Sequence, residues 1–488
     1  MMRSRTSLRD DPWFGVDSRW SWVTAGFLSW LLSAATVSQQ ALAVFFYGIV
    51  HSYGASRGEA SWPLILCGSC TCLGGPLMGY LCRRASCQVV LLVCTVAAGI
   101  ALCICSLADS ILILTFFFGI VLGVSQAGIH VAVNVLASQH FDKRRATACS
   151  VIFFFAGLNM LFVPTLAEFF RVTYGIRGTF LLLAGMTLNA CPAVIVTRSP
   201  EWMTRELSSS TVLHVGALEK PAVTAEEQLL PSFQSRTQST VETGESSTPN
   251  VKNLGGNEIP VFFRNSIVTK TVRLIAPCRK PVGLNQERRR GFATEFKQFW
   301  TLAFAVNALS FAVIMFGVAS FLLLSVDIAT DKGVAPYQAV FLLNAFAVGD
   351  IVFRPLSGLV IDSGLLSLEG VMLLGFFLQC IAYELLVWLR TFVSLLACSV
   401  LAGVSNGLRA SLQAPCLVND FGVDSLPLLM GGVIFCNGVI LLTRPLLVGY
   451  CRDHHGSYDL LLHMIAGASI VLCCVWAAKY YARRRKHR

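Results

Sequence analysis

Long apolar runs alternate with short polar segments along most of the chain, as in residues 89–107 and 111–137. A run of about 18 apolar residues is long enough to cross a bilayer as a helix. The alternation predicts an all-α membrane protein with twelve transmembrane helices. The predicted spans are 22–50, 60–82, 88–108, 111–137, 146–170, 177–197, 298–326, 336–361, 366–389, 392–415, 425–450 and 456–478.

A long polar segment, residues 198–297, interrupts this pattern between the sixth and seventh spans. Residues 222–250 are rich in Ser, Thr, Glu, Gln and Pro, and such a composition buries too little apolar surface to offset chain ordering. We therefore expect a largely disordered cytoplasmic loop that separates two six-helix halves, 22–197 and 298–478. A cytoplasmic N-terminus, 1–21, and a basic cytoplasmic tail, 479–488, flank them. Two such halves are typical of the major facilitator fold.

Composition and charge agree with a membrane protein. Hydrophobic residues make up 55% of the chain and charged residues 13%, against about 25% charged in soluble proteins. The net charge of +11 comes from basic residues beside the spans, so no nucleic-acid partner is expected. With these spans, 29 Lys and Arg residues fall on the side of both termini and 6 on the other. This asymmetry predicts cytoplasmic termini, and we expect the plasma membrane as the location.

The residues that could support metal or covalent chemistry are not arranged for it. The chain has 18 cysteines, most of them inside apolar spans. Cys67 and Cys70 have a metal-like spacing but lack a second ligand pair, so we interpret them as packing residues. No His, Asp or Glu cluster with metal spacing and no nucleophile elbow is present. We expect no metal, no cofactor and no enzymatic activity.

Asp350 and Arg354 are the sharpest candidates for chemistry inside the membrane. An ionisable residue in a span costs about 2.5–3.5 kcal/mol on insertion scales and usually marks a functional interior. The two residues are four positions apart, so they share a helix face and can pair. A structural ion pair is the alternative, but buried pairs are seldom good stabilisers. We therefore favour a functional pair.

Other polar residues form stripes on single helix faces, which must point to protein or water rather than lipid. Interhelical hydrogen bonding is the plainer interpretation of any one of them. Two stripes together with the charged pair predict a polar central cavity, and Arg444 in the eleventh span is a further candidate for its wall. The stripes are Gln126, His130 and Asn134 in the fourth span, and Asn406, Arg409 and Gln413 in the tenth.

Several short segments, in both halves but outside the central loop, resemble the monocarboxylate transporter family of solute carriers. Residues 17–22 (DSRWSW) resemble the family's acidic, two-tryptophan start of helix 1, although both early glycines are replaced. The remaining matches are 140–146 (HFDKRRA) followed by Ala156 and Gly157, then 174–178 (YGIRG), 331–333 (DKG), 349–355 (GDIVFRP) and 456–459 (GSYD).

The resemblance implies that Arg354 contacts a substrate carboxylate and that Asp350 takes part in proton coupling. Proton-coupled members carry a lysine in helix 1 where this chain has Gln40, and usually a glycine where it has Arg444. Loss of the lysine leads us to hypothesise weak or absent proton coupling, unless Arg444 or Arg409 supplies the second positive charge.

These observations predict a secondary transporter that moves small monocarboxylates or related organic anions by alternating access. One alternative is an uncoupled facilitator of aromatic amino acids or similar zwitterions, and another is a non-transporting receptor or scaffold. The expected partners are the organic anion, membrane lipid, a proton as the candidate coupled ion, and an ancillary single-span glycoprotein of the kind that family members often have. The candidate substrate-binding residues are Arg354, Asp350, Gln40, His130, Asn134, Asn406, Arg409 and Arg444.

Overall fold

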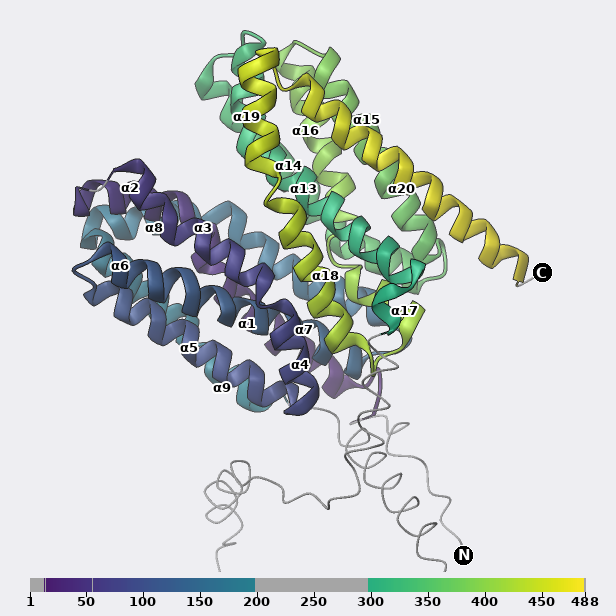
Figure 1. Ribbon diagram of the computed structural model, residues 1–488. Helices are drawn as coiled ribbons and strands as arrows, with labels where there is room; N and C mark the ends of the chain where they lie inside the picture. The colour runs from purple at the N-terminus through teal and green to yellow at the C-terminus, as the bar shows by residue number, and fades with distance from the viewer. Residues whose placement is uncertain (1–12, 14, 55, 198–296, 487–488) are drawn as a thin grey trace, which may run out of the picture. The chain divides into compact units, whose positions relative to one another are not determined.

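The computed structural model describes residues 13, 15–54, 56–197 and 297–486, and all regular structure in them is helical (Figure 1). The predicted all-α architecture is therefore confirmed, whereas the predicted disorder of 198–296 lies outside the described residues. The N-terminal half contains α1 (Arg19–Gln40), α2 (Leu42–Tyr53), α3 (Arg57–Leu73), α4 (Gly75–Arg84), α5 (Cys87–Leu107), α6 (Ile111–Leu114), a π-helix η2 (Thr115–Leu122), α7 (Gly123–His140), α8 (Arg145–Leu188) and α9 (Cys191–Val196). The C-terminal half contains a 3₁₀ turn η3 (Lys297–Trp300), α13 (Leu302–Asp331), α14 (Pro336–Asp362), α15 (Leu368–Trp388), α16 (Phe392–Gly407), α17 (Gln413–Phe421), α18 (Leu426–Leu441), α19 (Arg444–His455) and α20 (Asp459–Lys486).

The first two predicted spans are bent helix pairs. α1 and α2 meet at 41°, and α3 and α4 meet at 47°. The second bend falls at Gly74 and Gly75, and Pro76 lies in the first turn of α4, where its missing N–H leaves no hydrogen bond unmade. Counting each bent pair once, ten spans among the described residues satisfy length and hydropathy.

The fifth and sixth predicted spans form one nearly continuous helical run from Arg145 to Val196, 52 residues long. At 1.5 Å per residue it measures about 78 Å, more than twice the hydrocarbon thickness of a bilayer. Gly175 interrupts the helical backbone with φ 71° and ψ 179°, a conformation that suits glycine. We therefore divide the run there. The short apolar helix α16 corresponds to the tenth predicted span. With these two assignments the described residues accommodate the twelve predicted spans, ten of which satisfy length and hydropathy directly.

Two of the segments that resemble the transporter family pack against each other in the N-terminal half. The Asp17 carboxylate accepts hydrogen bonds from the backbone N–H groups of Lys143 (2.9 Å) and Arg144 (3.1 Å). The ring of Trp22 lies 5.0 Å from that of Phe141 in an edge-to-face contact. A carboxylate at the start of α8 satisfies free N–H groups and complements the helix dipole.

Two further segments that resemble the transporter family, 331–333 and 456–459, are joined through Arg452 in the C-terminal half. Arg452 pairs with Asp331, and its guanidinium lies over the ring of Tyr458 at 5.1 Å. Lys332 donates from Nζ to the carbonyl of Val387 at 2.9 Å, where α15 ends. These contacts tie α13 to α15, and α19 to the start of α20. Most of the family-like motifs therefore hold helix ends together.

The two halves meet where α8 packs on α14 and where α4 packs on α18. A methyl group on Gly75 would lie 2.5 Å from the carbonyl oxygen of Gly431, so only glycine allows the α4 and α18 backbones to touch. Thr147 at the start of α8 donates its backbone N–H to the Asp362 carboxylate of α14 at 2.7 Å. In contrast, α2 packs mainly on α8 and α3 of its own half, and α19 packs on α20.

Candidate functional site

A cavity of about 350 Å³ lies between the halves, and helices of both halves contribute to its wall. Much of the wall is apolar and carries flexible or aromatic side chains, namely Met160, Met315, Met430, Phe153 and Phe311. Neutral hydrogen-bonding side chains also line it, namely Gln39, Gln40, His130, Asn134, Gln413 and Asn437. Arg354 is the only lysine or arginine in the described wall, and no carboxylate lines it.

Arg354 reaches this cavity from α14 and contacts both halves. Its Nε and Nη2 atoms donate to Oδ2 of Asp350 at 2.9 and 2.6 Å, as the four-residue spacing predicted. Its Nη1 atom donates to the carbonyl of Phe153 on α8 at 3.1 Å. The Arg354 side chain is 12% exposed and that of Asp350 0%, so the arginine is the member of the pair that faces the cavity.

Asp350 is held from behind by α16. Its Oδ1 atom accepts a hydrogen bond from Nδ2 of Asn406 at 2.8 Å. α16 can approach this closely because it presents glycines to α14: a methyl group on Gly403 would lie 3.0 Å from the backbone nitrogen of Asp350. Asn406 was predicted as a cavity residue, but it acts one layer deeper, on the carboxylate that orients Arg354.

Gly157 on α8 faces the guanidinium from the other half. A methyl group on Gly157 would lie 3.4 Å from both Cζ and Nε of Arg354. A methyl group there would be in ordinary van der Waals contact with the guanidinium, so α8 packs closely on Arg354 at this point. Gly157 belongs to one of the family-like segments.

The N-terminal half contributes Gln40, His130 and Asn134 to the wall, as predicted. Gln40 is the last residue of α1, at the bend. The Asn134 amide donates to the carbonyl of His130 at 2.8 Å, so its nitrogen is used within α7. Gln126, one turn before His130 in the same stripe, donates instead to the carbonyl of Ala35 at 2.6 Å and lies in the protein core.

The structure does not place Arg409 in the cavity. Its side chain points toward α15, where Nη2 donates to Gln379 Oε1 at 2.6 Å and the guanidinium lies 4.4 Å from the ring centroid of Phe376. The predicted stripe assumed one continuous helix, but α16 ends at Gly407 and α17 begins at Gln413. The intervening turn changes the direction of Arg409, whereas Gln413 reaches the wall.

Arg444 also lies outside the cavity wall. The helix of the eleventh predicted span breaks at Leu442 and Thr443, and Arg444 begins α19 half-buried. The expectation that it lines the cavity came from the position of one charge in an apolar run. That pattern did not reveal the break in the helix.

Sequence reasoning did not select several polar wall residues, namely Thr36, Gln39, Thr71, Cys72 and Asn437. Cys72 and Asn437 come from opposite halves, and the Asn437 amide lies 3.9 Å from the Cys72 sulfur. A lone amide in the apolar run of α18 was a signal for Asn437. Gln39 and Cys72 had no comparable signal, because each lies among similar neighbours.

Comparison with known proteins supports the resemblance seen in the sequence. The Major Facilitator Superfamily profile matches residues 23–323. The chain is 22% identical to human monocarboxylate transporter 14, over 95% of this chain and 92% of that protein. It is 23% identical to mouse monocarboxylate transporter 12, over 93% of this chain and 83% of that protein.

A solved structure shows the same fold. It is that of the proton:xylose symporter XylE bound to 6-bromo-6-deoxy-D-glucose, with a TM-score of 0.60 at 13% identity, covering 93% of this chain and 94% of that one. The profile match, the relatives and the shared fold show that the chain is a multi-pass membrane transporter, not an enzyme, and that it belongs to the Major Facilitator Superfamily.

Proposed function

We propose that the protein moves small monocarboxylates or related organic anions across the plasma membrane by alternating access, with Arg354 as the carboxylate-binding group. The observation that carries this proposal is the position of Arg354, the only lysine or arginine among the described residues that line a cavity shared by both halves. A planar guanidinium offers two parallel donors that match a carboxylate. The relatives of this chain that are named monocarboxylate transporters support the same substrate class.

The Arg354 fork is already occupied by Asp350. A substrate carboxylate must therefore compete with Asp350, or bind through the remaining exposed part of the guanidinium. Asn406 keeps Asp350 partly satisfied during such an exchange. Releasing Arg354 then breaks one internal ion pair but does not leave the buried carboxylate of Asp350 without any partner. A buried carboxylate with no partner would cost much more free energy.

The apolar wall supports substrates larger than three-carbon acids. A volume of about 350 Å³ is at the lower end of the range for pockets that hold drug-sized ligands, about 300–1,000 Å³. Methionine side chains adapt to irregular apolar shapes. A carboxylate with an apolar or aromatic body therefore fits the site better than lactate alone.

The charge of the cavity wall favours anions over zwitterions as substrates. A substrate ammonium group would find no carboxylate among the described wall residues, only neutral acceptors such as the amide oxygens of Gln40 and Asn437. Anions are therefore favoured over amino acids. A receptor or scaffold has no need of a cation exposed in a cavity between two halves.

The contacts between the halves support an outward-facing state. α4 meets α18, and α8 meets α14, beside the loops predicted to be cytoplasmic, whereas α2 and α19 pack mainly within their own halves. Transport would require those contacts to separate and the opposite ends to meet. The proposed orientation is tested with epitope tags at both termini, which should be stained only after permeabilisation.

The direct test is uptake of labelled monocarboxylates into vesicles that contain the purified protein. A series of increasing size, from pyruvate to an arylpropionate, should show saturable uptake that the Arg354→Ala variant lacks. Phenylalanine serves as the matched zwitterion. Uptake of phenylalanine but not of any carboxylate would favour the amino-acid alternative, and uptake of neither would favour the scaffold.

A further inference from the structure

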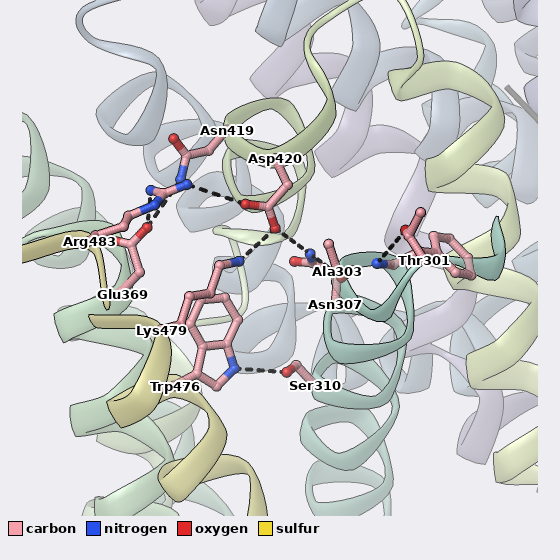
Figure 2. A network of polar contacts seen from close by, with 11 residues as sticks. Thr301, Ala303, Asn307, Ser310, Glu369, Asn419, Asp420, Trp476, Lys479 and Arg483 are labelled. Atoms are coloured by element: carbon pink, nitrogen blue, oxygen red, sulfur yellow. Dashed lines mark hydrogen bonds and ion pairs between the residues drawn. The ribbon is translucent and has the colours of Figure 1, made fainter. Parts of the chain in front are cut away.

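The end of α20 carries basic residues of two kinds. Lys479 and Arg483 turn inward and form a cluster with two buried acids (Figure 2). Lys479 Nζ lies 2.6 Å from Asp420 Oδ2, and Arg483 contacts both Asp420 and Glu369. Two acids balance two bases, so this cluster is formally neutral and its cations are not free for another anion.

Arg484 and Arg485 are the second kind, because both are exposed. The Arg484 guanidinium lies 5.1 Å from the ring centroid of Tyr480, one turn earlier. Within the part of the chain that the structure describes, no acid forms an ion pair with either arginine. The outer face of α20 therefore carries uncompensated positive charge immediately beside the neutral cluster.

A cleft of about 620 Å³ lies next to Arg484, between α20 and the turn that joins α14 to α15. The turn contributes Leu365, which is 76% exposed, and Leu366. Glu369 also lines the cleft, but Arg483 and Asn419 already bind its carboxylate. The cleft thus combines apolar side chains, a tyrosine ring and an unpaired guanidinium at the point where two spanning helices end.

We infer that this cleft binds the headgroup of an anionic phospholipid. Arg484 would bind the net negative headgroup, which phosphatidylcholine lacks because its choline neutralises the phosphate. Leu365 and Leu366 would contact the upper part of the acyl chains. Tyrosine beside basic residues is typical of the membrane–water boundary. The proposed cytoplasmic leaflet is the one that holds anionic lipids, which attract juxtamembrane Lys and Arg. The inference does not depend on the transported substrate.

The test uses the purified full-length protein in detergent, presented with equal amounts of phosphatidylserine and phosphatidylcholine of the same acyl chains. Native mass spectrometry counts the lipid retained. The wild type should prefer phosphatidylserine, and Arg484→Ala should lower that preference about fivefold. Arg84→Ala is the matched control, because Arg84 also stacks on a tyrosine one turn earlier, at 4.9 Å from Tyr80, but does not line this cleft.

Arg484→Lys should keep most of the preference, because a point charge still attracts the net negative headgroup. Arg484→Gln, which removes the charge but keeps a polar side chain, carries the test if Arg484→Ala lowers the melting temperature of the protein, and an unchanged preference in Arg484→Gln would then overturn the inference. An unchanged preference in Arg484→Ala, an equal loss in Arg84→Ala, or equal retention of both lipids by the wild type would overturn the inference. A second arm adds inorganic phosphate at millimolar concentration: displacement of the lipid would identify a free-phosphate site and would also overturn it.

Discussion

Arg354 and Arg409 are both intramembrane arginines of the C-terminal half, yet their surroundings differ in kind. Arg354 pairs with an acid, touches the opposite half through the Phe153 carbonyl, and lines the cavity. Arg409 is 2% exposed, stays within its own half, and is bound by an amide, a carbonyl and an aromatic face. The first is accessible from the cavity, as the proposed exchange with a substrate anion requires, whereas the second is enclosed.

The comparison shows that the cost of a buried charge does not by itself identify a functional residue. Both arginines are costly in a membrane, and both were predicted as cavity residues, Arg354 from its pairing with Asp350 and Arg409 from its place in a polar stripe. What separates them is access to a space where a ligand can enter. The following variants test whether that difference also separates transport from stability.

Replacing Arg354 should have the largest effect. Arg354→Ala removes the carboxylate-binding group and leaves Asp350 without its cation, and truncating one partner of a buried charge pair costs about 2–5 kcal/mol. Initial uptake of a labelled monocarboxylate should fall about 30-fold or more. Arg354→Lys should restore little, because a point charge does not reproduce the fork.

Surface expression of each Arg354 variant is the control, and Arg444→Ala is the comparison for loss of one intramembrane arginine outside the cavity wall. Arg444→Ala should keep uptake within about threefold of the wild type, since substitutions away from specific contacts change little. Near-normal transport by Arg354→Ala at equal surface expression would make the Asp350–Arg354 pair structural and remove the proposed substrate site.

Asn406→Ala should have the next largest effect. It removes the hydrogen bond to Oδ1 of Asp350 and leaves a buried carboxylate oxygen unpaired, which costs about 1–3 kcal/mol. We expect uptake to fall about tenfold, mainly through the maximal rate, because Asn406 does not line the cavity. Ser399→Ala is the matched control on the same helix, since the Ser399 hydroxyl bonds only its own helix, at the Leu395 carbonyl.

Arg409→Met should change transport least among the arginine variants. Methionine fills much of the same space, and replacing a buried charge by an apolar side chain is often neutral or stabilising. Gln379 loses one partner, a cost of about 1 kcal/mol. Uptake should stay within about threefold of the wild type. Any effect of the substitution on stability should appear as a shift in the melting temperature of the protein in detergent. A loss as deep as that of Arg354→Ala would give Arg409 a part in transport.

Much of the fold followed from sequence because its signals are long and periodic. Apolar runs of span length predicted the helices, and the polar segment predicted two halves. The sequence did not reveal the bend after Gln40, the interruption of the helix after Leu441, or the end of α16 at Gly407. Gln40 and Leu441 both fit a helix, so propensity alone gives no signal there, and Gly407 is one of many glycines in the spans, most of which do not end a helix. Packing against neighbouring helices decides where the axis bends.

The candidate site was predicted where its residues lie on one uninterrupted helix. Asp350 and Arg354 share α14, and His130 and Asn134 share α7, so four-residue spacing placed each pair correctly. Arg409 was misplaced because a turn intervenes between Asn406 and Gln413. The wall residues that sequence reasoning missed depend on contacts between helices distant in the chain, such as Cys72 with Asn437.

The remaining predictions concern coupling to protons. We expect uptake to respond strongly to the membrane potential and only weakly to external pH. Gln40 lines the cavity without a charge, so a substrate anion that crosses without a proton carries net charge. A potential of 100 mV is worth about 2.3 kcal/mol per charge, and inside-positive vesicles should therefore accumulate the anion about 50-fold more. A carrier that moves one proton with each anion would ignore the potential.

External pH should have the smallest effect of all, and it tests Asp350 directly. To accept a proton from the cavity, this carboxylate must release Arg354, although no second cation lines the described wall to take over the substrate. We therefore expect uptake to change less than about twofold between about pH 7.5 and pH 6, a range in which exposed histidines still titrate. A pH dye inside the vesicles should report little acidification when lactate or pyruvate is added. Rapid acidification that Asp350→Asn abolishes would show instead that Asp350 carries a proton despite the glutamine at position 40.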